Sequence, residues 1–289
     1  MGNYLRLSLV AVFWGGTFVA GRLVSLEVGP YSAAFIRFLL ATLFLLPFMI
    51  KEEGRLPGFN LRQGIALMLL GLIGVFAYNV LFFSGLKTVE AGRAALIIAT
   101  NPVLIAFFSF LLFGERFHPA MVVGIFCSVV GAAVVISRGD PLMLLHGELG
   151  LGELYLLGCV FSWVVYTLLG KRVMTGLKPL TAVTYSCLVG VIALLPFAIQ
   201  DHLFSTLGNI TPVSAASLLY LAVFGTALGF VWFYRGVYEI GPTRAGQFIN
   251  LVPVSAVLLG ILILGEKPSS SLLGGGALIV AGLILTNRK

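Results

Sequence analysis

The stretch Leu45-Leu46-Pro47-Phe48 occurs a second time as Leu194-Leu195-Pro196-Phe197, 149 residues later. This offset aligns further residues on either side of the stretch, and an offset of 151 continues the alignment after the polar segment around 50–62. The aligned pairs include Trp14 and Trp163, Gly21 and Gly170, Gly74 and Gly225, Phe82 and Phe233, Pro102 and Pro253, Gly124 and Gly275, and Gly131 and Gly282. The alignment predicts an internal duplication with repeats at 1–141 and 142–289.

The composition points to a membrane protein. The chain is 59% hydrophobic and 10% charged, with a mean hydropathy of +1.07, which is too apolar for a soluble domain of 289 residues. A helix needs ~20 apolar residues to cross the hydrocarbon layer. The runs are continuous, so helices are expected and not a barrel. Ten such runs occur, at about 5–22, 31–50, 63–84, 93–113, 119–137, 150–170, 180–199, 213–234, 244–264 and 271–287.

Five runs in each repeat imply that the second repeat enters the membrane in the opposite orientation, because five is an odd number. An all-α fold of two inverted five-helix repeats around a central cavity is therefore expected, and this architecture is typical of transporters. If the N-terminus is cytoplasmic, the cytoplasmic segments carry twelve Lys and Arg residues against five outside. This distribution predicts that both termini are cytoplasmic.

Signatures of an enzyme are missing from the membrane spans. The three histidines, His118, His146 and His202, fall in or beside loops, and Asp140 and Asp201 lie in loops. No phosphate-binding glycine loop occurs, and the three cysteines follow no metal-ligand spacing. Neither an enzyme nor a cofactor is predicted. The net charge of +7 is assigned to cytoplasmic loops, so no nucleic-acid partner is expected.

Polar and aromatic side chains inside the spans are the candidates for substrate binding. A polar group in hydrocarbon costs roughly 1–3 kcal/mol if it stays unpaired, so these groups are expected to face other helices or a wet cavity. Packing or a place in the interfacial aromatic belt is the alternative role for the aromatic members. The candidates are Trp14, Thr17, Tyr78, Asn79, Phe82, Thr100, Asn101, Trp163, Tyr166, Gln247 and Asn250.

Two further features of the spans leave alternatives open. Pro102 and Pro253 are expected inside helices, where each frees a backbone carbonyl that either serves a substrate or merely accompanies a kink. Arg37 is the one charged residue clearly within a span. It either binds an anionic group of a substrate or, as the favoured reading, extends to the nearer membrane surface.

The motifs that mark this duplication resemble the EamA family of the drug/metabolite transporter superfamily. They are Phe13-Trp14-Gly15-Gly16, Asn101-Pro102, Gly114-Glu115 with Gly124 and Gly131, Val252-Pro253, and Gly265-Glu266 with Gly275 and Gly282. The resemblance implies ten helices, a pseudo-twofold axis in the membrane plane and a cavity that opens alternately to each side. It also implies export of small metabolites from bacteria, with amino acids as a frequent substrate class.

The expected function is export of amino acids, with aromatic or other hydrophobic ones favoured, across the bacterial inner membrane. Membrane lipids and the small-molecule substrate are the expected partners, and a monomer suffices. Because no titratable carboxylate or histidine is expected near the membrane midplane, facilitated diffusion or exchange is predicted. The alternatives are a flippase for lipid-linked sugars and a scaffold subunit without transport activity.

Overall fold

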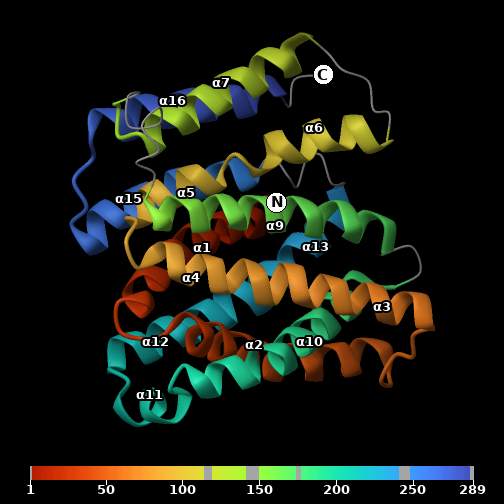
Figure 1. Ribbon diagram of the computed structural model, residues 1–289. Coiled ribbons are helices and arrows are strands. Elements are labelled where there is room, and N and C mark those ends of the chain that lie inside the picture. Colours follow the sequence, from red (N-terminus) through yellow and green to blue (C-terminus); the bar gives the residue numbers. More distant parts are fainter. Residues whose placement is uncertain (1, 114–118, 141–149, 174–176, 241–247, 287–289) are drawn as a thin grey trace.

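Helices are the only regular secondary structure in the residues that this computed structural model describes, which are 2–113, 119–140, 150–173, 177–240 and 248–286 (Figure 1). The all-α prediction is confirmed. The elements are α1 (Gly2–Ser25), α2 (Pro30–Glu53), α3 (Leu61–Leu70), η1 (Gly71–Ala77), α4 (Tyr78–Leu86), α5 (Ala91–Ile98), α6 (Asn101–Phe113), α7 (Pro119–Ile136), α9 (Leu151–Val173), α10 (Pro179–Gln200), α11 (Leu203–Asn209), α12 (Pro212–Tyr220), η2 (Leu221–Leu228), α13 (Gly229–Ile240), η3 (Phe248–Leu251), α15 (Val252–Leu264) and α16 (Ser270–Thr286).

Six helices of the described chain are long and apolar enough to cross a membrane. They are Tyr4–Ser25, Pro30–Glu53, Leu61–Leu86, Leu151–Leu169, Leu180–Gln200 and Pro212–Phe233. Four shorter apolar helices, Ala91–Ile105, Val122–Ile136, Val252–Leu264 and Ser270–Gly282, lie where the other four spans are predicted. In each repeat the long helices come first and the shorter ones last, so the lengths follow the duplication.

The sequence explains where several helices begin and end. Pro30 and Pro179 stand at the first turns of α2 and α10, where a missing backbone N–H breaks no helical bond. Gly54 ends α2 in the left-handed region, at φ 71°, and its N–H donates to the Ile50 carbonyl. Asn60 starts α3 with a capping box, because its side chain accepts from the Gln63 backbone while the Gln63 side chain accepts from the Asn60 N–H.

The fourth span of each repeat differs from the prediction. The run 93–113 is interrupted at Ala99 and Thr100, between α5 and α6. In the second repeat the 3₁₀-helix η3 precedes α15. Pro102 and Pro253 are each the second residue of a new helix, so the prediction that they sit inside continuous helices is wrong. A helix start is where a proline is best tolerated, which is the physical reason for the break.

Equivalent helices of the two repeats pack against each other in opposite directions, as the pair α2 and α10 shows. At one end, the backbone N–H groups of Tyr31 and Ser32 each donate to Asp201 Oδ2, at 3.0 Å. At the other end, Glu53 Oε1 accepts from Thr181 Oγ1 at 3.3 Å and lies 3.2 Å from Lys178 Nζ. The start of α2 therefore contacts the end of α10, and the start of α10 contacts the end of α2.

The pair α7 and α16 repeats this antiparallel arrangement at the opposite side of the bundle (Figure 1). A Cβ added to Gly131 would lie 2.6 Å from the Gly275 carbonyl oxygen, and one added to Gly282 would lie 2.5 Å from the Gly124 carbonyl oxygen. Gly275 and Gly282 are the copies of Gly124 and Gly131. Gly131 therefore lies against the copy of Gly124, and Gly124 lies against the copy of Gly131. An approximate twofold axis between the two helices requires this exchange.

The first helix of each repeat packs against the third helix of the other repeat. The first helix, α1, packs against α12, η2 and α13, while its copy α9 packs against α3, η1 and α4. Likewise α2 contacts η2, and α10 contacts η1. Both irregular segments, η1 and η2, are therefore enclosed by helices of the opposite repeat as well as their own.

Candidate functional site

Two π-helical segments, η1 and η2, occupy matching positions in the third helix of each repeat. A π-turn widens the helix and disturbs its regular hydrogen bonds, and such turns are frequent at functional sites. Polar side chains bond to carbonyls of these segments. Asn79 Nδ2 donates to the Val75 oxygen at 2.9 Å, and Thr226 Oγ1 donates to the Leu221 oxygen at 3.0 Å. The indole N–H of Trp14 donates to the Gly225 oxygen at 3.0 Å.

Arg37 links Asn79 in α4 to Thr226 in η2, and so connects the third helices of the two repeats. Its Nη1 donates to Asn79 Oδ1 at 3.1 Å, and its Nε donates to Thr226 Oγ1 at 3.3 Å. The Arg37 side chain is buried, with 7% of its surface exposed, and its guanidinium lies 5.2 Å from the centre of the Phe38 ring. We call Arg37, Asn79 and Thr226 the Arg37 network. The expectation that Arg37 extends to the membrane surface is wrong, because Asn79 and Thr226 provide acceptors inside the bundle.

Thr17 occupies a place equivalent to that of its copy, Tyr166, in the other repeat. Thr17 packs on Gly225, where an added Cβ would lie 2.7 Å from Thr17 Cγ2. Tyr166, which aligns with Thr17, packs on Gly74, where an added Cβ would lie 2.1 Å from the tyrosine ring. The first helix of each repeat therefore presses a predicted site residue onto the glycine of the opposite π-helical segment.

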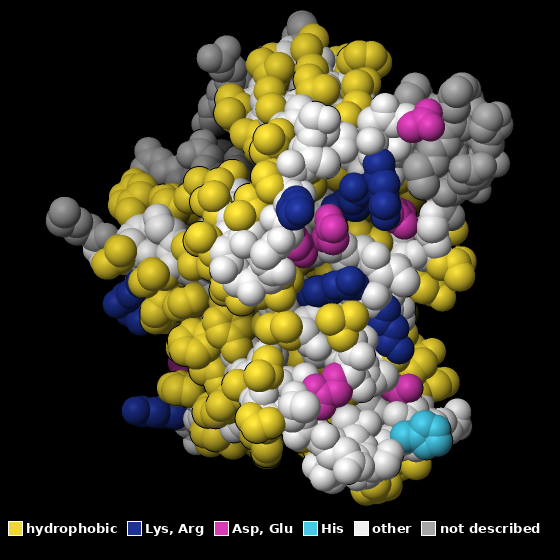
Figure 2. Space-filling view, turned by 90° about the vertical axis from the view of Figure 1, so that its left-hand side faces the viewer, with side chains coloured by type: hydrophobic (Ala, Val, Ile, Leu, Met, Phe, Trp, Pro, Cys, Tyr) yellow, Lys and Arg dark blue, Asp and Glu magenta, His cyan; other side chains and the backbone are white. Residues whose placement is uncertain are grey.

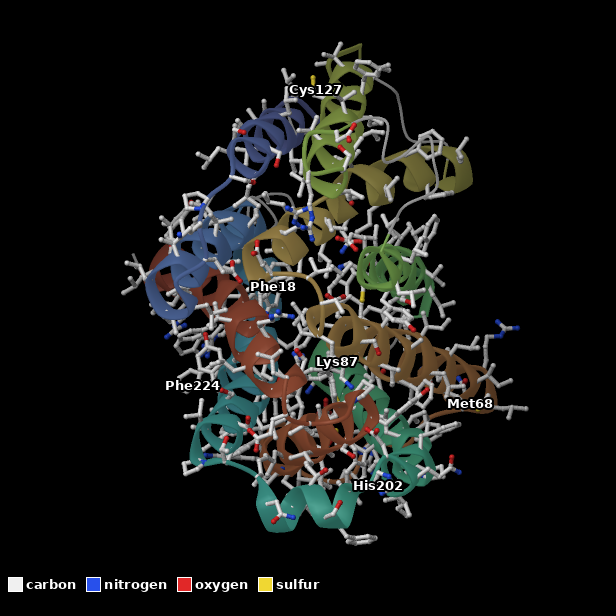
Figure 3. The ribbon with its side chains drawn as sticks, turned by 60° about the vertical axis from the view of Figure 1, so that its left-hand side comes forward. Phe18, Met68, Lys87, Cys127, His202 and Phe224 are labelled. Atoms are coloured by element: carbon white, nitrogen blue, oxygen red, sulfur yellow. The ribbon has the colours of Figure 1, made fainter. Side chains whose placement is uncertain are left out.

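Four of the aromatic candidates form a continuous series of ring contacts, while the Trp14 ring contacts Phe230 and Phe233 instead. Trp163 lies 5.5 Å from Tyr166 and 5.4 Å from Tyr78, measured between ring centres. Tyr78 in turn stacks on Phe82 at 6.1 Å. Phe82 is 2% exposed and meets Phe18, which lies in the interior of the bundle (Figure 3). The structure brings these predicted residues together, with Phe82 inside the apolar core.

The candidates from the fourth span of each repeat are placed differently. Thr100 bonds locally, with Oγ1 donating to the Ile97 oxygen at 2.7 Å. Asn101 is 6% exposed, and its Oδ1 has no hydrogen-bond partner among the described residues. This oxygen is an acceptor at the break between α5 and α6. Gln247 lies outside the described residues, and so does the side chain of Asn250, whose backbone belongs to η3.

Sequence reasoning missed Thr226 and did not include Arg37 among the binding residues. The signal was present in the aligned pair Gly74 and Gly225, since glycines at matching places in a helix mark close approach of another element. The alignment pairs Asn79 with Phe230 and Thr226 with Val75, so it could not show that Asn79 and Thr226 share a partner, Arg37. The network is built from different positions in the two repeats.

Carboxylates from one repeat bind helix starts of the other at the end of the bundle that contains Glu27, which we call the Glu27 end. Besides Asp201 at α2, Glu266 accepts from the backbone N–H groups of Ala91 and Gly92, at 2.6 and 3.0 Å. Glu27 accepts from the Thr211 backbone at 2.6 Å and from the Ser214 hydroxyl. Anionic groups stabilise helix N-termini. These contacts therefore hold the two repeats together at this end.

The Glu27 end is polar on its surface. Figure 2 shows charged side chains of both signs gathered on this face of the molecule, with hydrophobic side chains along its flanks. A depression beside Glu27 is lined by Ser25–Gly29 and Lys87. Hydrogen bonds from Ser214 and then Thr211 hold the pKa of the Glu27 carboxyl below its ordinary value. Among the described residues, no group of His, Cys, Asp and Glu is suited to a metal ion.

Several known proteins with similar sequences are named as transporters. Residues 3–137 and 150–288 each match the EamA-like transporter family. The uncharacterized transporter YyaM of Bacillus subtilis is 28% identical over 281 residues, covering 97% of this chain and 92% of that protein. The probable terminal-alkyne amino-acid exporter of Streptantibioticus cattleyicolor is 30% identical over 285 residues, covering 98% of this chain and 92% of that protein.

A solved crystal structure shares the fold of this chain. It aligns with a TM-score of 0.68 at 21% sequence identity, covering 98% of this chain and 96% of the other. The two matches to one family follow the two repeats recognised in the sequence, and antiparallel packing of equivalent helices accompanies them. The chain belongs to the EamA-like transporter family and is a multi-pass membrane transporter.

Proposed function

We propose that this transporter exports small metabolites across the bacterial inner membrane by alternating access, with amino acids that carry aromatic or other hydrophobic side chains as its favoured substrates. In this proposal ten membrane-spanning helices surround a central cavity, both termini are cytoplasmic, and the repeats divide between residues 141 and 142. One chain contains both repeats, so a monomer is sufficient. The S. cattleyicolor relative, named as a probable amino-acid exporter, supports the substrate class.

The observation that carries the proposal is the convergence of aromatic rings and polar groups on the two π-helical segments. Trp163, Tyr166 and Tyr78 offer ring surface to an apolar side chain, and such contacts add specific attraction beyond burial of area. Nearby, Asn79 and Trp14 supply hydrogen-bonding groups. The buried Asn101 Oδ1 is a further acceptor, suited to a substrate amine.

The test is counterflow of radiolabelled amino acids in proteoliposomes that contain the purified protein. We expect saturable transport of phenylalanine, tryptophan or leucine, and a substantial loss of it in Trp163→Ala. Phe161→Ala is the matched control, because Phe161 lies on the same helix with 58% of its surface exposed. Transport that survives Trp163→Ala unchanged would remove the proposed site. The absence of flux for every amino acid and related metabolite would remove the function and favour a scaffold or a flippase.

Facilitated diffusion or exchange is the proposed mode of energy coupling. The carboxylates discussed above, Glu27, Glu53, Asp201 and Glu266, lie at helix ends, where they bind backbone or surface groups. A proton-coupled carrier ordinarily keeps a titratable group within the membrane. Imposing a pH gradient on the vesicles should therefore leave the final substrate ratio near one, and accumulation against a gradient would contradict this mode.

A further inference from the structure

Arg37 carries a positive charge into the interior of the bundle, and no described residue forms an ion pair with it. Both of its hydrogen-bond acceptors, Asn79 Oδ1 and Thr226 Oγ1, belong to neutral side chains. A buried charge is ordinarily paired with an opposite charge, because neutral acceptors replace only part of its lost hydration. The resting structure therefore leaves this guanidinium without a countercharge.

The surroundings of Arg37 coincide with those of the candidate site. An added Cβ on Gly225 would lie 3.7 Å from Arg37 Nη2 and 2.7 Å from Thr17 Cγ2, while the Gly225 oxygen accepts from Trp14. Arg37, Thr17 and Trp14 therefore meet at one residue of η2. A guanidinium has five N–H donors in a planar fork, and this fork matches a carboxylate in a bidentate geometry.

We propose that Arg37 binds the carboxylate of the transported substrate, so that the substrates are carboxylate-bearing metabolites such as amino acids. This inference rests on the proposed function. The carboxylate supplies the countercharge that the described residues do not provide, and it competes with Asn79 and Thr226 for the same donors. Because Arg37 and Asn79 belong to the first repeat and Thr226 belongs to η2 of the second, binding also releases the link that Arg37 forms between the repeats.

The experiment compares each substrate with the counterpart in which a neutral amide replaces the carboxylate. Purified protein is titrated with L-phenylalanine and L-leucine, and with phenylalaninamide and leucinamide, while its melting temperature is recorded; counterflow is measured with the same four compounds. The amides keep the side chain and the amine but lack the carboxylate. We expect the carboxylates to bind about tenfold or more tightly than the amides, since bidentate charge-assisted bonds are strong.

Three variants assign this preference to Arg37. In Arg37→Gln the ratio of carboxylate to amide affinity should fall toward one. Arg37→Lys keeps the charge but not the planar fork, so it should retain part of the preference and serves if the glutamine variant fails to fold. Arg55→Gln is the control, because Arg55 is an exposed residue between α2 and α3 and the preference should persist there.

The outcomes separate this inference from the proposed function. Equal affinity of wild-type protein for carboxylates and amides would overturn the carboxylate site even if transport is observed. A preference that persists in Arg37→Gln would overturn the role of Arg37. Carboxylate-dependent stabilisation that is lost in Arg37→Gln, without flux of any amino acid, would support the site while rejecting the exporter.

Discussion

The two pairs of equivalent helices, α2 with α10 and α7 with α16, are held together by different kinds of contact. Both pairs are antiparallel and related by the approximate twofold axis. The first is joined at its ends by polar groups, Asp201 at the start of α2 and Glu53 at the start of α10. The second is joined along its length by Gly131 and Gly275, which bring the backbones together. In lipid, where burial of apolar surface gives no driving force between helices, polar bonds and close packing are the available alternatives.

Each arrangement has a different tolerance for change. Where two backbones touch, an added methyl group meets atoms that cannot rotate away. Where helix ends are joined by side chains, loss of one carboxylate leaves the rest of the interface in contact. The comparison therefore predicts larger effects from small substitutions in α7 and α16 than from loss of a charge at the ends of α2 and α10.

The largest effect on stability is expected at Gly275. A Cβ there would lie 2.7 Å from the Gly131 carbonyl oxygen, so Gly275→Ala should destabilise the protein by about 1–3 kcal/mol. Gly274→Ala is the control, because nothing lies within 4 Å of a Cβ at that position. It should leave stability unchanged or raise it by up to about 1 kcal/mol, because alanine favours a helix more than glycine does. Unfolding in detergent by heat or denaturant measures both. Equal effects of the two variants on stability would show that the close contact of Gly131 and Gly275 does not hold α7 and α16 together.

An intermediate effect is expected at Asp201. Asp201→Ala removes the acceptor for the backbone N–H groups of Tyr31 and Ser32, and loss of such a helix cap costs about 1–2 kcal/mol. Glu53→Ala breaks a bridge to Lys178, whose side chain is 54% exposed, so its cost should stay below about 1 kcal/mol. The same unfolding measurements apply. A larger loss of stability in Glu53→Ala than in Asp201→Ala would contradict the prediction that the Asp201 contacts contribute more.

The smallest effect is a dependence on pH at Glu27, beside the start of α2. The pKa of this carboxyl is lowered in the folded protein, so the folded state releases its proton more readily than the unfolded state. Its stabilising contribution is present above the ordinary carboxyl pKa and is lost as the pH falls through the lowered value. The difference in melting temperature between wild-type protein and Glu27→Gln should therefore shrink between neutral pH and about pH 3. A difference that is constant with pH would contradict the assigned hydrogen bonds.

Much of the fold could be predicted from the sequence because a duplication leaves repeated residues. The paired prolines and glycines indicated two repeats, and apolar runs of sufficient length indicated the long helices. The breaks before Pro102 and Pro253 could not be located by hydropathy, since Ala99 and Thr100 continue the apolar run while the backbone turns there. Hydropathy measures preference for lipid and does not register a change of backbone hydrogen bonding.

The sequence predicted which residues belong to the candidate site better than it predicted how they contact one another. Trp14, Tyr78, Asn79, Trp163 and Tyr166 were recognised as groups that need partners inside the membrane, and the structure places them around η1 and η2. The partners themselves were not predictable. Whether a long cationic side chain bends outward or inward depends on acceptors from distant helices, and these acceptors appear only in three dimensions.

Arg37 has consequences for the history of this chain. The residue that aligns with it in the second repeat is Ser186, which donates to the Ala182 carbonyl within its own helix. A homodimer of identical five-helix units would have to bury this arginine in both copies, and each buried charge would cost free energy. A single gene encoding both units removes this constraint, since one copy keeps the arginine while the other replaces it. Covalent linkage thus made an unsymmetrical interior attainable in a symmetrical frame.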